Sequence, residues 1–219
     1  MGPRTGPMIP ALVAALALAG STAAQPSPSW PNTPAMRREA ISQVEALNAE
    51  LLSHDSATLT LERWCASHAL ASPAKVVAER VRGDDKPLSS AQRELLRLGP
   101  SEPVRYRRVR LRCGAHVLSE ADNWYRPERL TPEMNRLLET TDTPFGKVVQ
   151  PLGFHRRTLE ATDLLATTPA DPRPSAALRL PAAVLQHRAV LELPDGTPFS
   201  EVVETYTDQV LDFQPRPFR

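Results

Sequence analysis

Residues 104–125 constrain the fold more than any other segment of the chain. They read VRYRRVRLRC-GAH-VLSEADNWY, two runs rich in β-branched and aromatic residues on either side of a short turn. This pattern predicts an antiparallel β-hairpin. Because side chains alternate between the two faces of a strand, Arg107 and Val109 share one face, while Arg108 and Arg110 share the other. The hairpin therefore has one partly apolar face and one charged face.

Further helices and strands follow from periodicity and capping residues. Apolar residues at three- and four-residue spacing, or a capping residue before such a run, predict helices over 36–52, 56–68 and 89–98 and from Thr131. Alternation predicts strands over 75–82, 152–161, 185–193 and 199–207. Strands in succession with helices inserted between pairs predict an α+β fold with a mainly antiparallel sheet and flanking helices.

The N-terminal segment predicts export. Residues 1–24 contain an uncharged apolar stretch, Ile9–Ala19, followed by small residues, as expected of a secretory signal peptide. The alternative, an uncleaved N-terminal anchor, stays open. We then expect a Pro- and Ser-rich spacer at 25–35, a single domain at 36–213 and a loose tail at 214–219. The mature protein is expected to be periplasmic or secreted, with no membrane span.

Charge balance argues against a nucleic-acid partner. The chain has 26 Lys and Arg residues against 25 Asp and Glu, and removing the signal takes away Arg4, leaving 25 against 25. A net charge near zero disfavours nonspecific binding to nucleic acids or anionic membranes. The Arg-rich run at 105–112 contains a single aromatic residue, Tyr106, and not the interleaved series on which bases stack. The expected partner is a small molecule.

The two cysteines allow more than one interpretation. In an exported protein, Cys65 and Cys113 can form a disulfide, or both can be buried as small hydrophobic residues. Each also begins a Cys-x-x-His step, ending at His68 and His116, so a Cys₂His₂ zinc site is a third option. Such short spacings arise by chance and exported thiols oxidise, so we expect no metal and no cofactor.

The segments 104–149 and 196–207 (GTPFSEVVETYT) together resemble the chorismate pyruvate-lyase family. That family removes pyruvate from chorismate and leaves 4-hydroxybenzoate. The resemblance covers most of the mature chain. It implies an α+β fold with an antiparallel sheet of about six strands, a ligand enclosed beneath flaps, and no metal or cofactor.

The resemblance also implies two catalytic positions. The family's Glu on the last strand corresponds to Glu204, between apolar neighbours, where a carboxyl group can act as an acid or a hydrogen-bond partner. The alternative role for Glu204 is a structural ion pair with one of the many arginines. The family's Arg on the first hairpin strand corresponds to Arg108 when positions are counted back from Cys113. Strand alternation instead favours Arg107, on the apolar face, and both candidates stay open.

Five further residues are expected to contact the ligand. They are Leu59, Asp122, Asn123, Phe145 and Tyr206.

Two of these positions depart from the family. Asp122 and Asn123 stand where it has a small residue and an Arg, which would weaken the binding of a dianion and suit a different ligand. Glu201, on the opposite face of its strand from Glu204, is expected to be solvated. The Pro- and Ala-rich segment 166–181 is expected to form an exposed insertion or flap.

Three functions fit these features. The first is an exported chorismate lyase-like enzyme that eliminates pyruvate from chorismate. The second is a non-catalytic periplasmic protein that uses the same fold to bind a small aromatic or carboxylate molecule. The third is a structural envelope protein with a vestigial pocket. Export and the altered pocket positions favour binding or a vestigial pocket over catalysis, because chorismate is a cytosolic intermediate. The sequence has no Gly-x-Ser-x-Gly elbow, phosphate loop or His-Glu-x-x-His motif.

Overall fold

A computed structural model describes residues 1–2, 29–169 and 175–214. The predicted signal peptide beyond its first two residues, part of the predicted flap and the tail after Gln214 lie outside the described residues. The helices are α1 (Pro34–Leu52), α2 (Ala57–Ser67), α3 (Ser90–Leu95), α4 (Pro132–Thr140), α5 (Phe145–Val148) and α6 (Leu164–Thr167). The strands are β1 (Val76–Arg80), β2 (Arg105–Cys113), β3 (His116–Tyr125), β4 (His155–Asp163), β5 (Ala183–Glu192) and β6 (Pro198–Thr207). Three short 3₁₀ turns follow strands or helices: η1 (Pro127–Arg129), η2 (Gln150–Leu152) and η3 (Asp208–Leu211).

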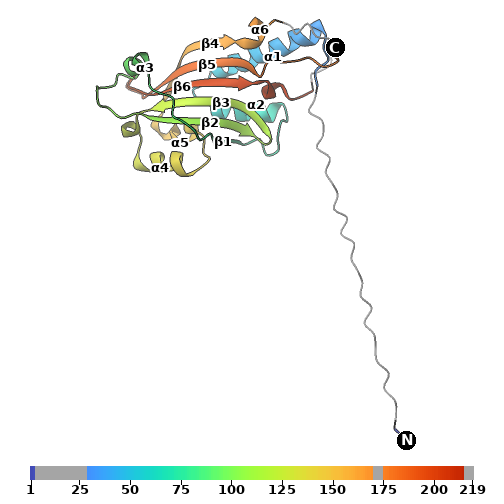
Figure 1. Ribbon diagram of the computed structural model, residues 1–219, viewed down its shortest axis with the longest axis horizontal. Helices are drawn as coiled ribbons and strands as arrows, with labels where there is room; N and C mark the ends of the chain where they lie inside the picture. Colours follow the sequence, from blue (N-terminus) through green and yellow to red (C-terminus); the bar gives the residue numbers. More distant parts are fainter. Residues whose placement is uncertain (3–28, 170–174, 215–219) are drawn as a thin grey trace.

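The six strands form one antiparallel sheet in the order β1-β2-β3-β6-β5-β4 (Figure 1). Each half of the sheet is a set of three consecutive strands, and the pairing of β3 with β6 joins the halves. The predicted α+β class with an antiparallel sheet of six strands and flanking helices is confirmed. The predicted hairpin is β2–β3, which turns at Gly114, a residue with the positive φ of 59° that glycine tolerates best.

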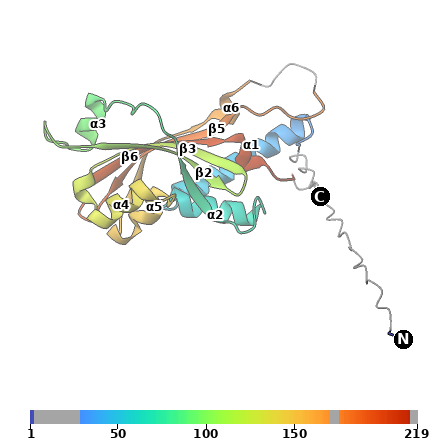
Figure 2. The same ribbon diagram turned by 60° about the horizontal axis from the view of Figure 1, so that its bottom comes forward.

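Helices α1, α2, α4 and α5 lie on one side of the sheet (Figure 2). In α1, the buried residues Ala40, Val44, Leu47 and Leu51 recur every three or four positions, so one stripe of the helix faces the sheet. The side chain of Thr33 caps this helix by accepting a hydrogen bond from the Met36 amide. Within the described ranges, no helix is both long and apolar enough to cross a membrane.

The covered face of the sheet holds two separate hydrophobic cores. The larger core packs beneath α1 and α2 and contains Leu47, Trp64 and Tyr206. The smaller core packs beneath α4 and α5 and includes Phe145 and Phe199. A seam between two cores is a place where polar groups can lie without interrupting either one.

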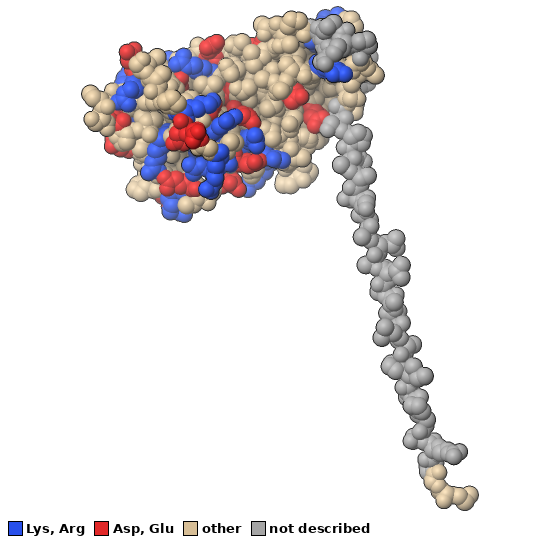
Figure 3. Space-filling view, in the orientation of Figure 1, with Lys and Arg blue, Asp and Glu red and all other residues tan. Residues whose placement is uncertain are grey.

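The other face of the sheet carries charge. Figure 3 shows acidic and basic side chains interleaved on this side of the molecule. The arginines at 108, 110 and 112 of β2 form ion pairs there with Glu79 or Glu120. Because the pairs are more than a third exposed on at least one side, water screens them and each contributes little to stability. This face follows the alternation expected of the hairpin.

The folded domain begins earlier than the sequence indicated. Trp30 falls within the predicted spacer, yet it is 3% exposed and its indole Nε1 donates to the Leu211 carbonyl at 2.9 Å. Pro31 forms a β-bridge with Ala177, which lies in the predicted flap. The prediction of a spacer was wrong from Trp30 onward. The indole ring of Trp30 is buried among residues that are distant in sequence, and composition does not reveal such a contact. Leu178, also in the flap segment, packs against the larger core.

The two cysteines are joined. Cys65 of α2 and Cys113 of β2 form a disulfide across a sequence separation of 48 residues, and both are fully buried. The zinc alternative is therefore wrong, because a metal site needs free thiolates. The disulfide attaches the C-terminal part of α2 to the end of β2, so the start of α2 is held over the sheet.

Replacing both cysteines, Cys65→Ala with Cys113→Ala, is expected to lower the free energy of unfolding by about 4 kcal/mol, because a closed loop of this length restricts the unfolded chain. Urea unfolding followed by tryptophan fluorescence measures the change. Wild-type protein unfolded and refolded in a reducing agent is the control and should match the variant. Equal stability of the variant and the oxidised wild type would contradict the prediction.

Candidate functional site: a cavity between the two cores

A cavity of about 50 Å³ lies on the covered face of the sheet, at the seam between the two cores. The larger core contributes Val109, Ala121 and Val202 to its wall, and the smaller core contributes Phe145 and Phe154. The other lining residues are Asp55, Ser56, Ala57, Thr58, Arg107, Leu111, Asn123, Gly146, Arg156, Leu191 and Glu204. The wall is mostly apolar, with a few polar groups that converge on it.

The strand register places the polar groups. Arg107 of β2 lies opposite Asn123 of β3, and Asn123 lies opposite Val202 of β6. In the neighbouring row, Ala121 lies opposite Glu204. All of these side chains point toward the helices, because residues directly opposite one another share a face of an antiparallel sheet.

Arg107 is the most unusual residue of the cavity. It is 3% exposed, its Nη2 donates to the Thr143 carbonyl at a long 3.4 Å, and its Nε has no hydrogen-bond partner. In the described part of the chain, no carboxylate forms an ion pair with it. Burial, with the nearby charge of Arg80, lowers the pKa of Arg107 to about 10. The guanidinium is therefore protonated at neutral pH and buried, with no ion-pair partner among the described residues, although the charge of Asp142 acts on it.

A second arginine in the cavity does have its anion. Arg156 of β4 reaches across β5, and its Nη2 lies 2.6 Å from Glu204 Oε2, with both side chains less than a tenth exposed. Burial disfavours the charged guanidinium, but the charge of Glu204, its hydrogen bond and the charges of Tyr206 and Asp55 together raise the pKa of Arg156. The Tyr206 hydroxyl donates to the same carboxylate oxygen at 3.1 Å, and the pKa of this tyrosine is raised by its burial and by Glu204. The alternative role expected for Glu204, an ion pair with an arginine, is present.

A buried histidine lies behind this pair. His187 of β5 is directly opposite Glu204, and its Nε2 is 2.7 Å from the Asn48 side-chain oxygen. Burial lowers the pKa of His187 to about 4, so the ring is neutral at pH 7. Among the buried lining residues, Arg156 and Glu204 cancel and Arg107 leaves one positive charge, while the exposed Asp55 carboxylate also lines the cavity.

The start of α2 closes one side of the cavity. Ser56 caps this 11-residue helix by accepting from the Leu59 amide. The first helical amides, of Ala57 and Thr58, have no acceptor within the helix, and the helix dipole makes this end positive. Gly146 of α5 lies against it, since a Cβ at Gly146 would be 3.2 Å from Ser56 Oγ. Glycine thus lets α5 pack close to the helix start.

The structure brings four of the predicted site residues to the cavity and leaves four outside. Arg107, Asn123, Phe145 and Glu204 line it. Leu59, Arg108, Asp122 and Tyr206 do not. Leu59 instead borders an adjoining hollow, and Tyr206 lies behind Glu204 in the core.

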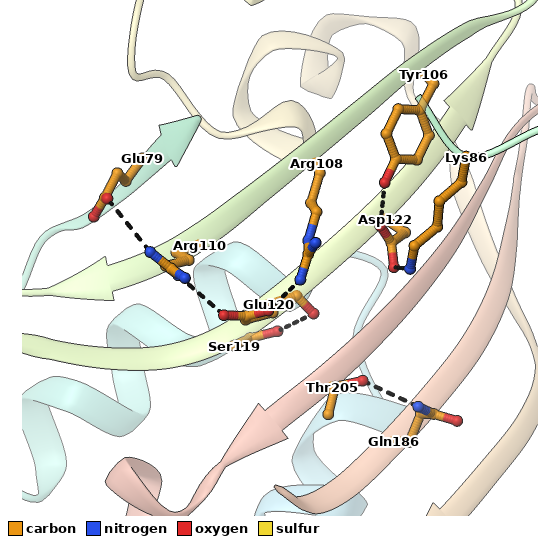
Figure 4. Close-up of polar contacts among 10 residues, drawn as sticks. All are labelled: Glu79, Lys86, Tyr106, Arg108, Arg110, Ser119, Glu120, Asp122, Gln186 and Thr205. Atoms are coloured by element: carbon orange, nitrogen blue, oxygen red, sulfur yellow. Dashed lines mark hydrogen bonds and ion pairs between the residues drawn. The ribbon is translucent and has the colours of Figure 1, made fainter. Parts of the chain in front are cut away.

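Arg108 and Asp122 lie opposite each other on the outer face of the sheet (Figure 4). Arg108 pairs with Glu120 at 2.9 Å, and Asp122 accepts a hydrogen bond from the Tyr106 hydroxyl and pairs with Lys86. Both were expected beside the ligand, but strand alternation turns each of them away from this cavity.

Glu201 also departs from expectation. It lies on the outer face as predicted, yet it is 1% exposed rather than solvated, and Arg188 donates to it at 2.7 Å. The ion pair and the neighbouring side chains cover it. Glu201 therefore belongs to the packed part of this face.

Sequence reasoning missed Arg156, Phe154 and the amides at the start of α2. Arg156 stands in the run HRRTLE, where neighbouring arginines give no sign of which one is buried. Its partner is 48 residues away in sequence. Alternation along β4 would have separated Arg156 from Arg157, but only the strand's position in the sheet shows which face is covered.

The chain is 53% identical over 193 residues to uncharacterized protein y4mC of Sinorhizobium fredii (strain NBRC 101917 / NGR234), a match that covers 84% of this chain and 81% of that one. The chain belongs to the y4mC family. No protein-family model matches it. The resemblance to the chorismate pyruvate-lyase family stays a prediction.

The solved structures that align with this member of the y4mC family are less similar to it than y4mC is. The effector domain of PhnF from Mycobacterium smegmatis aligns with 70% of this chain and 89% of its own, at 10% identity and a TM-score of 0.45. A GntR-family transcriptional regulator from Enterococcus faecalis aligns with 65% and 97%, at 14% identity and a TM-score of 0.41. At these scores the likeness bears on neither ligand nor activity.

Replacing Glu204 with Gln is expected to lower the free energy of unfolding by about 3 kcal/mol, because the buried Arg156 guanidinium loses its anion. Arg156→Met should cost a similar amount, and the double variant should cost less than the sum of the two. Urea unfolding of the four proteins measures this coupling.

The matched control is the exposed pair of Arg108 and Glu120, for which Arg108→Met and Glu120→Gln should show coupling below about 1 kcal/mol. Additive effects of the Arg156 and Glu204 substitutions would show that the buried pair does not act as a unit.

Proposed function

We propose that this protein binds a small molecule with one carboxylate and an apolar body, and that Arg107 holds the carboxylate. The observation that carries the proposal is the buried, protonated Arg107 guanidinium, which lines an apolar cavity without an ion-pair partner in the described part of the chain. Burying an unpaired charge is costly, and a bound anion offsets that cost. A planar guanidinium holds a carboxylate by two parallel hydrogen bonds.

The start of α2 supports the same ligand class. Its free amides at Ala57 and Thr58 and its positive dipole end favour an anion in the cavity. The apolar residues Val109, Phe145 and Val202 suit the uncharged part of the ligand. Arg156 and Glu204 form a neutral pair that offers hydrogen bonds to a polar substituent.

The size of the cavity limits the ligand. A volume of about 50 Å³ is below the roughly 150 Å³ of an apolar cavity that encloses a benzene ring. A second hollow, of about 300 Å³, shares Asp55, Ser56 and Phe154 with it. A short aliphatic carboxylate fits the cavity as it stands, and an aromatic carboxylate needs the Phe154 side to open toward that hollow.

Binding without catalysis is the form of the proposal that the contacts favour. Glu204 Oε2 already accepts hydrogen bonds from Arg156 and Tyr206, so this oxygen is occupied. Chorismate has two carboxylates, whereas one guanidinium without an anion lines the described cavity. Elimination of pyruvate from chorismate is the enzymatic alternative that the sequence resemblance implies.

We also propose that the protein is exported to the periplasm or secreted. The support is the predicted signal peptide at residues 1–24 together with the buried disulfide, which persists in oxidising compartments. Mass spectrometry of protein produced in a bacterial host should find it in the periplasm or medium, with its N-terminus near residue 25. Intact, reduced protein in the cytosol would refute export.

Arg107→Met is expected to weaken the binding of a carboxylate ligand at least tenfold, because charge-assisted hydrogen bonds are lost. Calorimetric titration with acetate, pyruvate, benzoate, 4-hydroxybenzoate and chorismate measures affinity, and release of pyruvate from chorismate measures turnover. Arg108→Met is the matched control, since it removes the same charge one residue away on the outer face, and it should leave affinity within twofold. Equal weakening by the two variants, or no saturable binding at all, would refute the proposal, and pyruvate release would favour the lyase.

A further inference from the structure

A different hollow, of about 450 Å³, lies beside β2 where the sheet loses its edge strand β1. The ladder between β1 and β2 ends with Arg80 opposite Val109, after which the Val81 amide donates to the Arg108 carbonyl. The first part of β2 therefore has no β1 neighbour. The chain after β1 turns away and leaves a solvent-open depression beside it.

The hollow is rich in arginine. Its charged lining residues are Arg80, Arg82, Asp85, Arg107, Arg108 and Glu139.

Two of these charges are neutralised by partners. Arg108 pairs with Glu120, and Glu139 pairs with Arg105. No ion pair within the described ranges involves the remaining lining residues, Arg80, Arg82, Asp85 and Arg107. Three cations against one anion leave an excess of two positive charges.

The geometry brings like charges together. Arg107 lines both this hollow and the inner cavity, and the charge of Arg80 acts on it. Arg107 is 3% exposed and its Nε has no partner. A buried guanidinium near a second cation, with no ion-pair partner in the described part of the chain, is unfavourable unless an anion binds, although the charge of Asp142 acts against that of Arg80.

We propose that this hollow, lined by Arg80, Arg82 and Arg107, is a binding site for a phosphoryl group. Guanidinium groups match the oxygens of phosphate in a two-point arrangement. A phosphate monoester carries roughly 1.5 to 2 negative charges at pH 7, which matches the excess of positive charge, whereas a single carboxylate does not. The site is distinct from the carboxylate site proposed for the inner cavity, although Arg107 borders both.

The test is calorimetric titration of the full protein with inorganic phosphate and glycerol 1-phosphate in a chloride buffer of low ionic strength. Wild type should bind one equivalent saturably, and Arg80→Ala with Arg82→Ala should weaken binding at least tenfold. The matched control is Arg38→Ala with Arg129→Ala, two exposed arginines outside the hollow, which removes the same charge and should change affinity by less than twofold. Thermal unfolding of each variant confirms that it is folded.

Cosedimentation with vesicles containing phosphatidic acid separates a lipid headgroup from a soluble ester. Loss of vesicle binding in the Arg80 and Arg82 variant, but not in the control, assigns the phosphoryl group to a lipid. Binding of glycerol 1-phosphate in solution with the same dependence assigns it to a soluble ester.

Absence of saturable binding to every phosphoryl probe, or equal weakening in the control variant, overturns the proposal. Titrating the same two variants with carboxylates distinguishes the phosphoryl site from the carboxylate site in the inner cavity. Carboxylate binding unchanged by Arg80→Ala with Arg82→Ala, beside lost phosphate binding, shows two sites. If the phosphoryl probes bind and the carboxylates do not, only the proposed carboxylate-binding function is refuted.

Discussion

The pairing of β3 with β6 is the interaction on which the rest of the structure depends. Without it the chain would form two separate sets of three strands, each with its own small core. The ladder runs from Ser119 opposite Tyr206 to Tyr125 opposite Ser200, between segments far apart in sequence. Closing so long a loop costs conformational entropy, which the apolar surface buried on the covered face must offset. The pairing then creates the seam in which the cavity lies.

Polar groups gather at that seam in two different ways. Arg156, Glu204 and Tyr206 satisfy one another, so their burial is compatible with a stable core. Arg107 has only a long contact to a carbonyl, which departs from the rule that buried charges are paired. Departures of this kind concentrate at binding sites, because a charged group that binds a ligand cannot also have all its hydrogen bonds and its ion pair within the protein. The contrast between the two arginines is the physical basis for the proposal that Arg107 holds the charge of a ligand.

One strand supplies both environments. Arg107 of β2 is buried in the cavity wall, while Arg108 is on the outer face with Glu120 beside it. The outer pairs are screened by water and tolerate change, whereas the inner guanidinium is sensitive to any neighbouring charge. Arg107 also borders the hollow beside β1, so its charge faces two separate spaces. A single position therefore couples the electrostatics of the inner cavity to those of the surface.

The sequence by itself determined the fold class, most elements and the inward side of the hairpin, because hydrophobic periodicity and turn residues are local properties. Alternation alone favoured Arg107 over Arg108, and apolar neighbours marked the inward side of Glu204. The sequence did not predict that Trp30 lies in the core or that Glu201 is buried. It also did not predict that Asp122 faces outward, because the alignment with the lyase family placed Asp122 beside the ligand. Tertiary structure decided these, and it supplied Arg156 from a strand on the far edge of the sheet. Such contacts depend on which distant strands pair and which face the helices cover, and no local pattern encodes either.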